Sequence, residues 1–293
     1  MKQHKYLKIT ISLILLIALI TAASIFLSYN VLKVRTFSYE TDKAVDPVRA
    51  VVISDLHEHE FGKDNVKLVE KIREQEPDII LMVGDFVNQD SADSTVAVKL
   101  VEQLSKLAPV CYSLGNHEES YMAKTDWNFP TEIEKAGAHF LDKEYVDMDI
   151  RGTKLRIGGG MFSYAFGADG KDSAAAAPED VKNFLMDFQD TDRLKIMMAH
   201  RPDSFIFGDA ASVWDVDLVV SGHDHGGQVV VPFAGGVFGG DQGYFPKYVH
   251  GMYEKDRLHL FVSSGLGSAN EPLPRVNNLP EVAVVEIEKS TQT

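Results

Sequence analysis

Metal-binding side chains follow five apolar runs of this 293-residue sequence. The five motifs are Asp55-Leu56-His57, Gly84-Asp85, Gly115-Asn116-His117-Glu118, His200 and Gly222-His223-Asp224-His225. Carboxylate and imidazole donors in this mixture suit hard or borderline divalent metals, whereas a soft-metal site requires thiolates. The only cysteine, Cys111, lies inside an apolar run, where we expect it to pack as a small core residue. The motifs therefore indicate a hydrolase that uses two metal ions.

The apolar runs that precede the motifs are each short enough for one buried strand. They span residues 48–53, 79–83, 110–114, 194–199 and 216–220. The intervals 65–75 and 95–107 have the apolar spacing of amphipathic helices, so the first half of the chain alternates strand and helix. This alternation predicts βαβ units in a partly parallel sheet, with the metal ligands meeting at one edge.

The second half of the chain reads mainly as strands. We expect a hairpin around Arg151-Gly152-Thr153, a helix near 179–188, and further strands at 228–231, 258–262 and 282–287. The whole order predicts an α/β fold in which two mixed sheets pack face to face with helices outside. Three long segments rich in Gly or Pro interleave with the motifs: 158–177, 233–246 and 265–280. As a group they are candidates for the mouth of the substrate site, and plain surface connections are the alternative for each.

Composition limits the classes of partner. With 45% hydrophobic and 25% charged residues, the chain is ordinary for a globular protein, and we expect one catalytic domain with an N-terminal extension. The formal charge is −14, but residues 1–36 hold five basic and no acidic side chains. The remainder therefore has 24 basic and 43 acidic side chains, a formal charge of −19. Such a body repels phosphate backbones, so a nucleic-acid polymer is not an expected partner.

The N-terminal extension reads as a membrane segment. Residues 9–27 contain no charge, and as a helix they would span about 28 Å, close to the hydrocarbon thickness of a bilayer. Lys2, Lys5 and Lys8 precede the run and favour a cytoplasmic N-terminus. We predict a cytoplasmic end (1–8), a transmembrane signal anchor (9–28), a juxtamembrane linker (29–47), an extracytoplasmic catalytic domain (48–288) and a tail (289–293). The alternative is a signal peptide cleaved among the small residues 21–24, which would give a secreted protein.

The five motifs, in this order, resemble those of the calcineurin-like metallophosphoesterase superfamily over residues 48 to about 288. The run 222–228 and the apolar N-terminus are similar to its bacterial branch of membrane-associated or exported phosphodiesterases. The resemblance implies a four-layer αββα sandwich and two divalent metal ions, for which the ligand set accepts Mn, Fe, Zn or Co. It implies that one ion is held by Asp55, His57 and His225, and the other by Asn116, His200 and His223, with Asp85 bridging them. It further implies attack on phosphorus by a hydroxide shared by the metals, with His117 protonating the leaving oxygen.

One motif departs from the protein-phosphatase branch. There, Gly-Asp-x-x-Asp is followed by Arg-Gly, and the second Asp orients the catalytic histidine. Here that position is Asn88, followed by Gln89. We expect the Asn88 amide to orient His117 without favouring an imidazolium, as a carboxylate would.

The missing arginine also removes a bidentate phosphate clamp, which disfavours a protein phosphatase. Arg201 and Arg275 are the candidates to contact substrate in its place. Glu118 is expected to shape the turn behind the metal ligands rather than to act as a base. Asp224, between two predicted ligands, is expected to face solvent.

The sequence therefore predicts a membrane-anchored, extracytoplasmic phosphoesterase that acts on phosphodiesters, with phosphomonoesters as a further substrate class. Its substrate would be a phosphoester associated with the envelope or with lipid. Two alternatives remain: a pyrophosphohydrolase of a nucleotide-linked lipid precursor, and a non-catalytic interaction module at the membrane or cell wall. Cytoplasmic synthesis of such precursors argues against the first, and the complete ligand set argues against the second.

Overall fold

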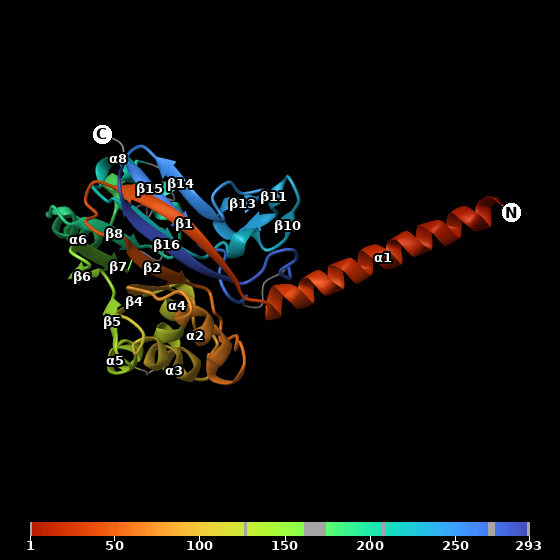
Figure 1. Ribbon diagram of the computed structural model, residues 1–293, viewed down its shortest axis with the longest axis horizontal. Helices are drawn as coiled ribbons and strands as arrows, with labels where there is room; N and C mark the ends of the chain where they lie inside the picture. The colour runs from red at the N-terminus through yellow and green to blue at the C-terminus, as the bar shows by residue number, and fades with distance from the viewer. Residues whose placement is uncertain (1, 126–127, 161–173, 207–208, 269–272, 292–293) are drawn as a thin grey trace.

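A 29-residue N-terminal helix, α1 (Lys2–Asn30), extends away from the rest of the structure (Figure 1). The computed structural model describes residues 2–125, 128–160, 174–206, 209–268 and 273–291. Within His4–Asn30 an 18-residue window reaches a mean hydropathy of 2.6, and none of that window is buried. Among the described residues, this is the one helix long and apolar enough to cross a membrane.

Sheet A is mixed and contains six strands in the order β1, β16, β2, β3, β4, β5. Their bounds are β1 (Lys33–Thr41), β16 (Glu281–Lys289), β2 (Val48–Ile53), β3 (Ile79–Val83), β4 (Val110–Ser113) and β5 (Ala138–Leu141). Strands β2 to β5 run parallel, as the βαβ pattern predicts. Strand β16 is antiparallel to β2 and parallel to β1. Three of the five metal-binding motifs therefore follow the ends of adjacent strands of this sheet, β2, β3 and β4.

Sheet B also has six strands, in the order β14, β15, β9, β8, β7, β6. Their bounds are β14 (Gly251–Lys255), β15 (Leu258–Val262), β9 (Leu218–Ser221), β8 (Leu194–Met198), β7 (Thr153–Gly159) and β6 (Glu144–Ile150). The four central strands run parallel, and the two edge strands are antiparallel to their neighbours. The predicted hairpin around residues 151–153 is the β6–β7 connection.

Helices cover the outer face of each sheet. On sheet A lie α2 (Val66–Arg73), α3 (Thr95–Leu104), α4 (Asn116–Lys124) and α5 (Phe129–Lys135). On sheet B lie α6 (Glu179–Gln189), α7 (Asp203–Ile206) and α8 (Ala210–Val213). Short 3-10 turns, η1 (Lys63–Asn65), η2 (Ala174–Ala176), η3 (His225–Gly227) and η4 (Gly240–Gln242), complete the connections.

Side-chain alternation along the strands builds three apolar layers. In β2, Val51 and Ile53 pack with the helices on sheet A, while Ala50 and Val52 pack between the sheets. In β8, Met197 packs with the helices on sheet B. The layers therefore alternate helix, sheet, sheet and helix, and the predicted four-layer αββα sandwich is confirmed.

A small lobe of short strands follows η3. It contains the pairs β10 (Val230–Val231) with β11 (Gly235–Gly236), and β12 (Phe238–Gly239) with β13 (Gly243–Tyr244). The strand predicted at 228–231 is thus reduced to a two-residue ladder. The lobe lies on the side of the body from which α1 leaves (Figure 1).

The structure differs from the sequence expectation at the segment 29–47. We expected a linker, but β1 occupies much of it and pairs with β16 from Lys33 opposite Glu281 to Thr41 opposite Lys289. As an edge strand it buries only Tyr39 fully, so its polar sequence carries little strand signal. Helices α4 and α5 and strands β5 and β14 are also additions. Of the three expected mouth segments, 161–173 and 269–272 lie outside the described residues.

Candidate metal centre and active site

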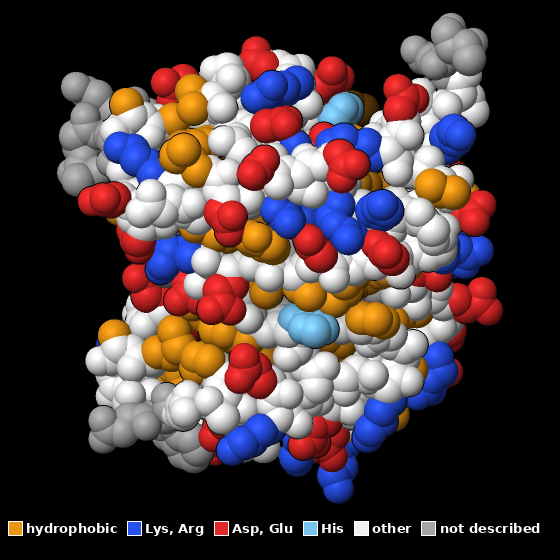
Figure 2. Space-filling view, turned by 90° about the vertical axis from the view of Figure 1, so that its left-hand side faces the viewer, with side chains coloured by type: hydrophobic (Ala, Val, Ile, Leu, Met, Phe, Trp, Pro, Cys, Tyr) orange, Lys and Arg blue, Asp and Glu red, His pale blue; other side chains and the backbone are white. Residues whose placement is uncertain are grey.

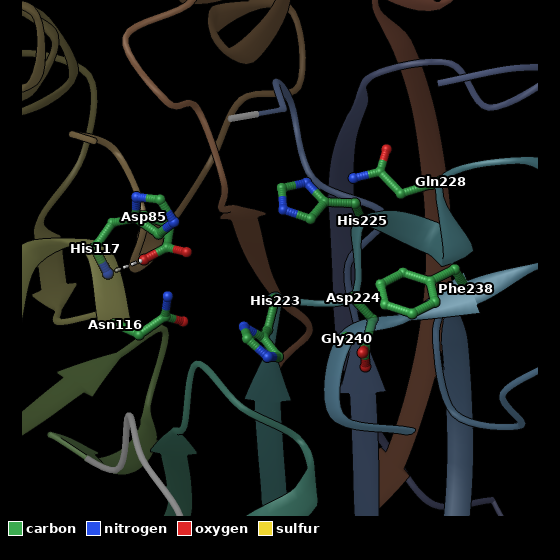
Figure 3. Close-up of a pocket in the computed structure, with 9 residues that line it drawn as sticks. All are labelled: Asp85, Asn116, His117, His223, Asp224, His225, Gln228, Phe238 and Gly240. Atoms are coloured by element: carbon green, nitrogen blue, oxygen red, sulfur yellow. Dashed lines mark hydrogen bonds between the residues drawn. The ribbon is translucent and has the colours of Figure 1, made fainter. Parts of the chain in front are cut away.

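The predicted ligands leave the C-terminal ends of strands in both sheets. Sheet A supplies Asp55 and His57 after β2, Asp85 after β3, and Asn116 and His117 after β4, and sheet B supplies His200 after β8 and His223 and His225 after β9. A cavity of about 50 Å³ lies where the two sets meet (Figure 3). Among the described residues it is lined by Asp85, Asn116, His117, His223, Asp224, His225, Gln228, Phe238 and Gly240.

The backbone is left-handed at five of the seven predicted metal ligands. The φ angles are 54° at Asp55, 50° at His57, 60° at Asp85, 71° at His223 and 46° at His225. This conformation is uncommon for residues other than glycine and concentrates at sites where the surrounding fold enforces it. The loops therefore hold these side chains where a relaxed chain would not place them.

Among the described residues, three overlapping groups of donor atoms lie close enough to hold a metal ion, and one of them, His57, Asp85 and His117, shares a member with each of the other two. One ligand atom from each of Asp55, His57 and His225 lies within 4.8 Å of the others, and the same holds for Asp85, His200 and His223. Asp85 contacts both of these groups, because its Oδ2 lies 3.9 Å from Nε2 of His57 and 3.0 Å from Nε2 of His200. Asn116 lines the same cavity as Asp85. All seven predicted ligands are thus brought together, with Asp85 between the groups.

Hydrogen bonds turn three of the imidazoles toward the cavity. Nδ1 contacts an oxygen in each case: Oδ1 of Asn88 for His57 (3.1 Å), the Val83 carbonyl for His200 (2.8 Å) and the Gly267 carbonyl for His225 (3.2 Å). An Nδ1–H donor fixes the tautomer and leaves the Nε2 lone pair for a metal.

Some polar atoms at the cavity that could bind a metal ion have no hydrogen-bond partner among the described residues. Nε2 of His57 and Oδ1 of Asn116 are buried and form no hydrogen bond with the described residues. Buried polar atoms normally have a partner. Orphaned donors of this kind, beside two buried carboxylates, fit divalent metal ions.

The electrostatics of the cavity favour the ligand forms of His57, His225 and Asp85 but not of every group. Burial opposes the charged form of His200, but the carboxylates of Asp85 and Asp55 outweigh it and raise the pKa of His200 to about 10. Burial lowers the pKa of His57 to about 4 and lowers that of His225 well below its usual value, so both imidazoles are neutral. Burial raises the pKa of Asp55 to about 6. Burial opposes the charged form of Asp85 too, but the facing histidines, His200 first, hold its pKa well below the usual range. Two close carboxylates attract cations, and a divalent ion supplies that charge.

His117 and Asn88 are not paired, contrary to the sequence expectation. Oδ1 of Asn88 accepts from His57, and its Nδ2 donates to the His57 carbonyl (3.3 Å) and to Oε2 of Glu58 (3.0 Å). Nδ1 of His117 instead accepts the backbone N–H of Gln89, at 3.1 Å. Asn88 lies in the loop after β3, and its side chain points to His57 in the loop after β2. The spacing of the motifs along the sequence does not reveal this direction. Asn88 therefore positions a predicted metal ligand.

Glu118 is buried and holds the loops behind Asp85 together. Its carboxylate accepts the backbone N–H groups of Asp85 (2.7 Å), Phe86 (2.7 Å) and Gly115 (2.9 Å), together with the Tyr112 hydroxyl (2.7 Å). The bond from Gly115 also caps α4, since Glu118 is the third residue of that helix. This arrangement agrees with the expected role in shaping the turn.

Glycine is required where α4 begins. A Cβ at Gly115 would lie 2.1 Å from Oδ1 of Asp85, inside any allowed contact. The backbone N–H of His117 donates to that same oxygen at 2.9 Å. The tight approach therefore orients the central carboxylate.

Arg275 does not reach substrate, which corrects the sequence expectation. It is fully buried, and its guanidinium donates to the carbonyls of Ser264 (2.8 Å), Gly267 (2.9 Å) and Asn278 (3.2 Å). The Gly267 carbonyl is also the acceptor for His225. Arg275 therefore braces the loop behind a predicted metal ligand, where carbonyl dipoles satisfy its charge.

The other expectations at the mouth are changed as well. Arg201 follows His200 and is half-buried, but neither it nor Arg275 is among the described residues that line the cavity. Asp224 is buried rather than solvated, because Nε2 of Gln242 donates to its Oδ2 at 2.7 Å. Phe238 and Gly240 form a wall that no motif identified, although they fall within the expected mouth segment 233–246.

Comparison with known proteins identifies the family. The model of the calcineurin-like phosphoesterase family matches residues 48–227. The chain belongs to this family. It is similar to the uncharacterized metallophosphoesterase YkuE of Bacillus subtilis, with 28% identity over 84% of this chain and 80% of that protein. It is also similar to the phosphodiesterase YaeI of Escherichia coli, with 26% identity over 82% of each chain.

Among solved structures, the phosphopantetheinyl hydrolase of Mycobacterium tuberculosis is similar, with a TM-score of 0.46 and 14% identity over 74% of this chain and 89% of that chain. Family membership and the assembled ligands together make this chain a metal-dependent phosphoric ester hydrolase. The resemblance inferred from the motifs is confirmed at the level of the family and its bacterial branch.

Proposed function

We propose that this chain is a membrane-anchored, extracytoplasmic phosphodiesterase that binds two divalent metal ions. The observation that carries the proposal is the position of Asp85 between two ligand groups, with Oδ2 3.9 Å from Nε2 of His57 and 3.0 Å from Nε2 of His200. A carboxylate placed in this way can hold two like charges close together. Two-metal sites of that geometry serve in-line displacement at phosphorus.

The residues of the site would have different roles in the reaction. Bound divalent ions would supply Lewis acidity toward a phosphoryl oxygen and lower the pKa of a water. His117 accepts Gln89 N–H at Nδ1, so its neutral form carries the proton on Nε2. That proton is available to the leaving oxygen, as expected from the resemblance. Asn88, Glu118 and Arg275 keep the ligands in place.

Phosphodiesters are the favoured substrate class. Among the described residues that line the cavity there is no arginine to clamp a phosphomonoester dianion. The cavity measures only about 50 Å³, so most of a substrate would lie outside it. The name of the similar protein YaeI, a phosphodiesterase, supports the same choice.

Anchoring rests on α1 and on its flanking charges. The apolar side chains of the helix are exposed over most of its length, and exposed apolar surface of this extent is stable in a bilayer. Lysines precede the helix, which favours a cytoplasmic N-terminus and an extracytoplasmic body. A signal sequence passes the same test of length and hydropathy.

The chemistry is tested with the purified full-length chain loaded with Mn, Zn, Fe or Co. We expect hydrolysis of bis-p-nitrophenyl phosphate to exceed that of p-nitrophenyl phosphate and of pyrophosphates. Asp85→Asn should lower metal content and abolish activity, whereas His117→Ala should keep the metals and slow turnover. Full activity in His117→Ala would overturn the proposal that His117 donates a proton. A purified chain that binds no metal and hydrolyses no phosphoester would overturn the proposed enzymatic activity.

Topology is tested separately in cells. Protease added outside intact spheroplasts should degrade the body while the N-terminus stays protected, and the chain should keep α1 when its N-terminal sequence is read. A body protected from protease would overturn the extracytoplasmic placement and would favour a cytoplasmic lipid precursor as substrate. A mature chain that begins after residues 21–24 would replace the anchor with a secreted protein.

A further inference from the structure

An aromatic lobe, residues 229–246, lies beside the point where α1 joins the body. It contains only one charged residue, Asp241, in 18 positions. Its large side chains face outward: Phe233 is fully exposed, Tyr244 is 74% exposed and Phe245 is 66% exposed. Soluble surfaces rarely gather such residues without a partner. The composition and exposure of the lobe therefore indicate that it contacts another apolar surface.

The lobe is connected to α1 through Asn277, which bonds to both. The backbone N–H of Asn277 donates to Oγ of Ser24 at 2.6 Å, and its side chain donates to the Val230 carbonyl at 3.1 Å. The next residue, Asn278, donates its backbone N–H to Oγ of Ser28 at 3.3 Å. Ser24 lies within the uncharged run 9–27. The part of α1 that contacts the body is therefore the last turns of its apolar stretch.

This contact fixes the level of the lobe against the bilayer. Because Ser24 belongs to the apolar run, an α1 that spans a bilayer would place the loop at Asn277, and the lobe strand bonded to that loop, at the boundary of the hydrocarbon region. Figure 1 shows β10, β11 and β13 on the side of the body from which α1 extends. Aromatic side chains favour that interfacial layer, where the rings are buried and a tyrosine hydroxyl stays hydrated.

The surroundings of the lobe agree with a membrane surface. Lys33, which begins β1, and Lys247, which follows the lobe, are both exposed. Basic side chains at this level complement anionic headgroups. On the opposite face of the body, acidic and basic side chains are spread among the apolar ones (Figure 2).

We infer that the aromatic lobe docks into the interfacial layer of the same bilayer that α1 spans, as a second membrane contact of the body. This inference rests on the proposed anchoring by α1. The lobe also supplies Phe238 and Gly240 to the wall of the metal cavity. Docking therefore holds the cavity close to the headgroups rather than letting the body swing freely on its helix.

The inference is tested with the full chain in vesicles of phosphatidylethanolamine and phosphatidylglycerol. Cys111 is buried, so a cysteine introduced by Phe233→Cys or Tyr244→Cys takes up an environment-sensitive dye selectively. Met186→Cys is the matched control, because Met186 is 60% exposed on α6, a helix on the far side of the body from α1. We expect blue-shifted emission at 233 and 244, with quenching by shallow spin-labelled lipids several-fold greater than at 186.

The outcomes separate this inference from the proposed anchoring. Equal quenching at 233, 244 and 186 in chain that floats with the vesicles overturns docking by the lobe and leaves anchoring intact. Chain that does not float with the vesicles overturns both. Hydrolysis of a soluble phosphodiester is measured in the same samples and reports on the chemistry independently of either.

Discussion

The backbone N–H of Gln89 donates a hydrogen bond to Nδ1 of His117, at 3.1 Å. A main-chain donor cannot exchange its role, so it favours the imidazole tautomer with the proton on Nε2. An imidazolium would bring two donors face to face at Nδ1. The neutral imidazole of His117 therefore presents its N–H at Nε2.

The first prediction follows from this donor role. His117→Ala should lower kcat by about 10²–10³-fold, the usual effect of losing one donor to a developing negative charge. His117→Gln should lose about as much activity as His117→Ala, because an amide N–H can donate a hydrogen bond but cannot transfer its proton to the leaving oxygen. Metal content by mass spectrometry should match wild type in both variants. Substantial activity in His117→Gln would mean that His117 supplies a hydrogen bond rather than a proton.

The second prediction concerns Asn88 and metal affinity. Asn88→Ala removes the acceptor that orients His57, and such losses weaken metal binding by about 10–100-fold. Asn88→Asp should retain more affinity than Ala, because a carboxylate still accepts from Nδ1. Competition with a chelator measures the change, and Asn183→Ala on the exposed face of α6 is the control. Unchanged affinity in Asn88→Ala would remove the positioning role.

The third prediction tests Glu118 as a structural acceptor. Glu118→Gln turns an NH₂ group toward backbone donors, and we expect the free energy of unfolding to fall by about 3 kcal/mol, since each buried unsatisfied group costs about 1–3 kcal/mol. Glu119→Gln, one residue along the same helix and exposed, should change stability little. Urea unfolding of both variants gives the comparison. A loss confined to activity, with stability intact, would instead assign Glu118 a chemical role.

The sequence motifs predicted which residues would converge, because ligands at the C-terminal ends of parallel strands lie at one edge of their sheet. In this fold the ligand-bearing edges of the two sheets meet at the cavity. The motifs did not predict side-chain direction. Asn88 turns toward His57, and Arg275 turns into the body, because contacts distant in sequence decide each rotamer. Strand β1 escaped prediction for a related reason: its partner, β16, lies at the other end of the chain, and an exposed edge shows no apolar alternation.

The fourth prediction gives the pH dependence of stability from Glu281. Burial alone would raise the pKa of this carboxyl, but hydrogen bonds and charges from His250 (2.8 Å) and Arg35 (2.6 Å) lower it below its usual 4.5. A carboxylate with a lowered folded pKa stabilises the fold above its unfolded value and loses that contribution as pH falls. Glu281→Gln should therefore lower Tm at pH 7, and its difference from wild type should shrink below pH 4.5.

The matched control is Glu286→Gln, whose salt bridge with Arg49 is partly exposed. The Tm of that variant at pH 7 should fall less than that of Glu281→Gln, because solvent weakens the Glu286–Arg49 ion pair. Calorimetry from pH 7 downward follows both. A gap between Glu281→Gln and wild type that stays constant with pH would show that the carboxylate contributes no charge-dependent stability.

The place of β16 between β1 and β2 has a consequence for biosynthesis. The strand that joins the first strand of the body to the rest of sheet A, β16 (Glu281–Lys289), is made after every other described strand. Until those residues emerge from the ribosome, β1 has no neighbour and α1 has no finished body beside it. Sheet A of the nascent chain therefore remains incomplete until β16 has been made, and an incomplete domain is a state in which a polypeptide can be threaded through a narrow translocation channel.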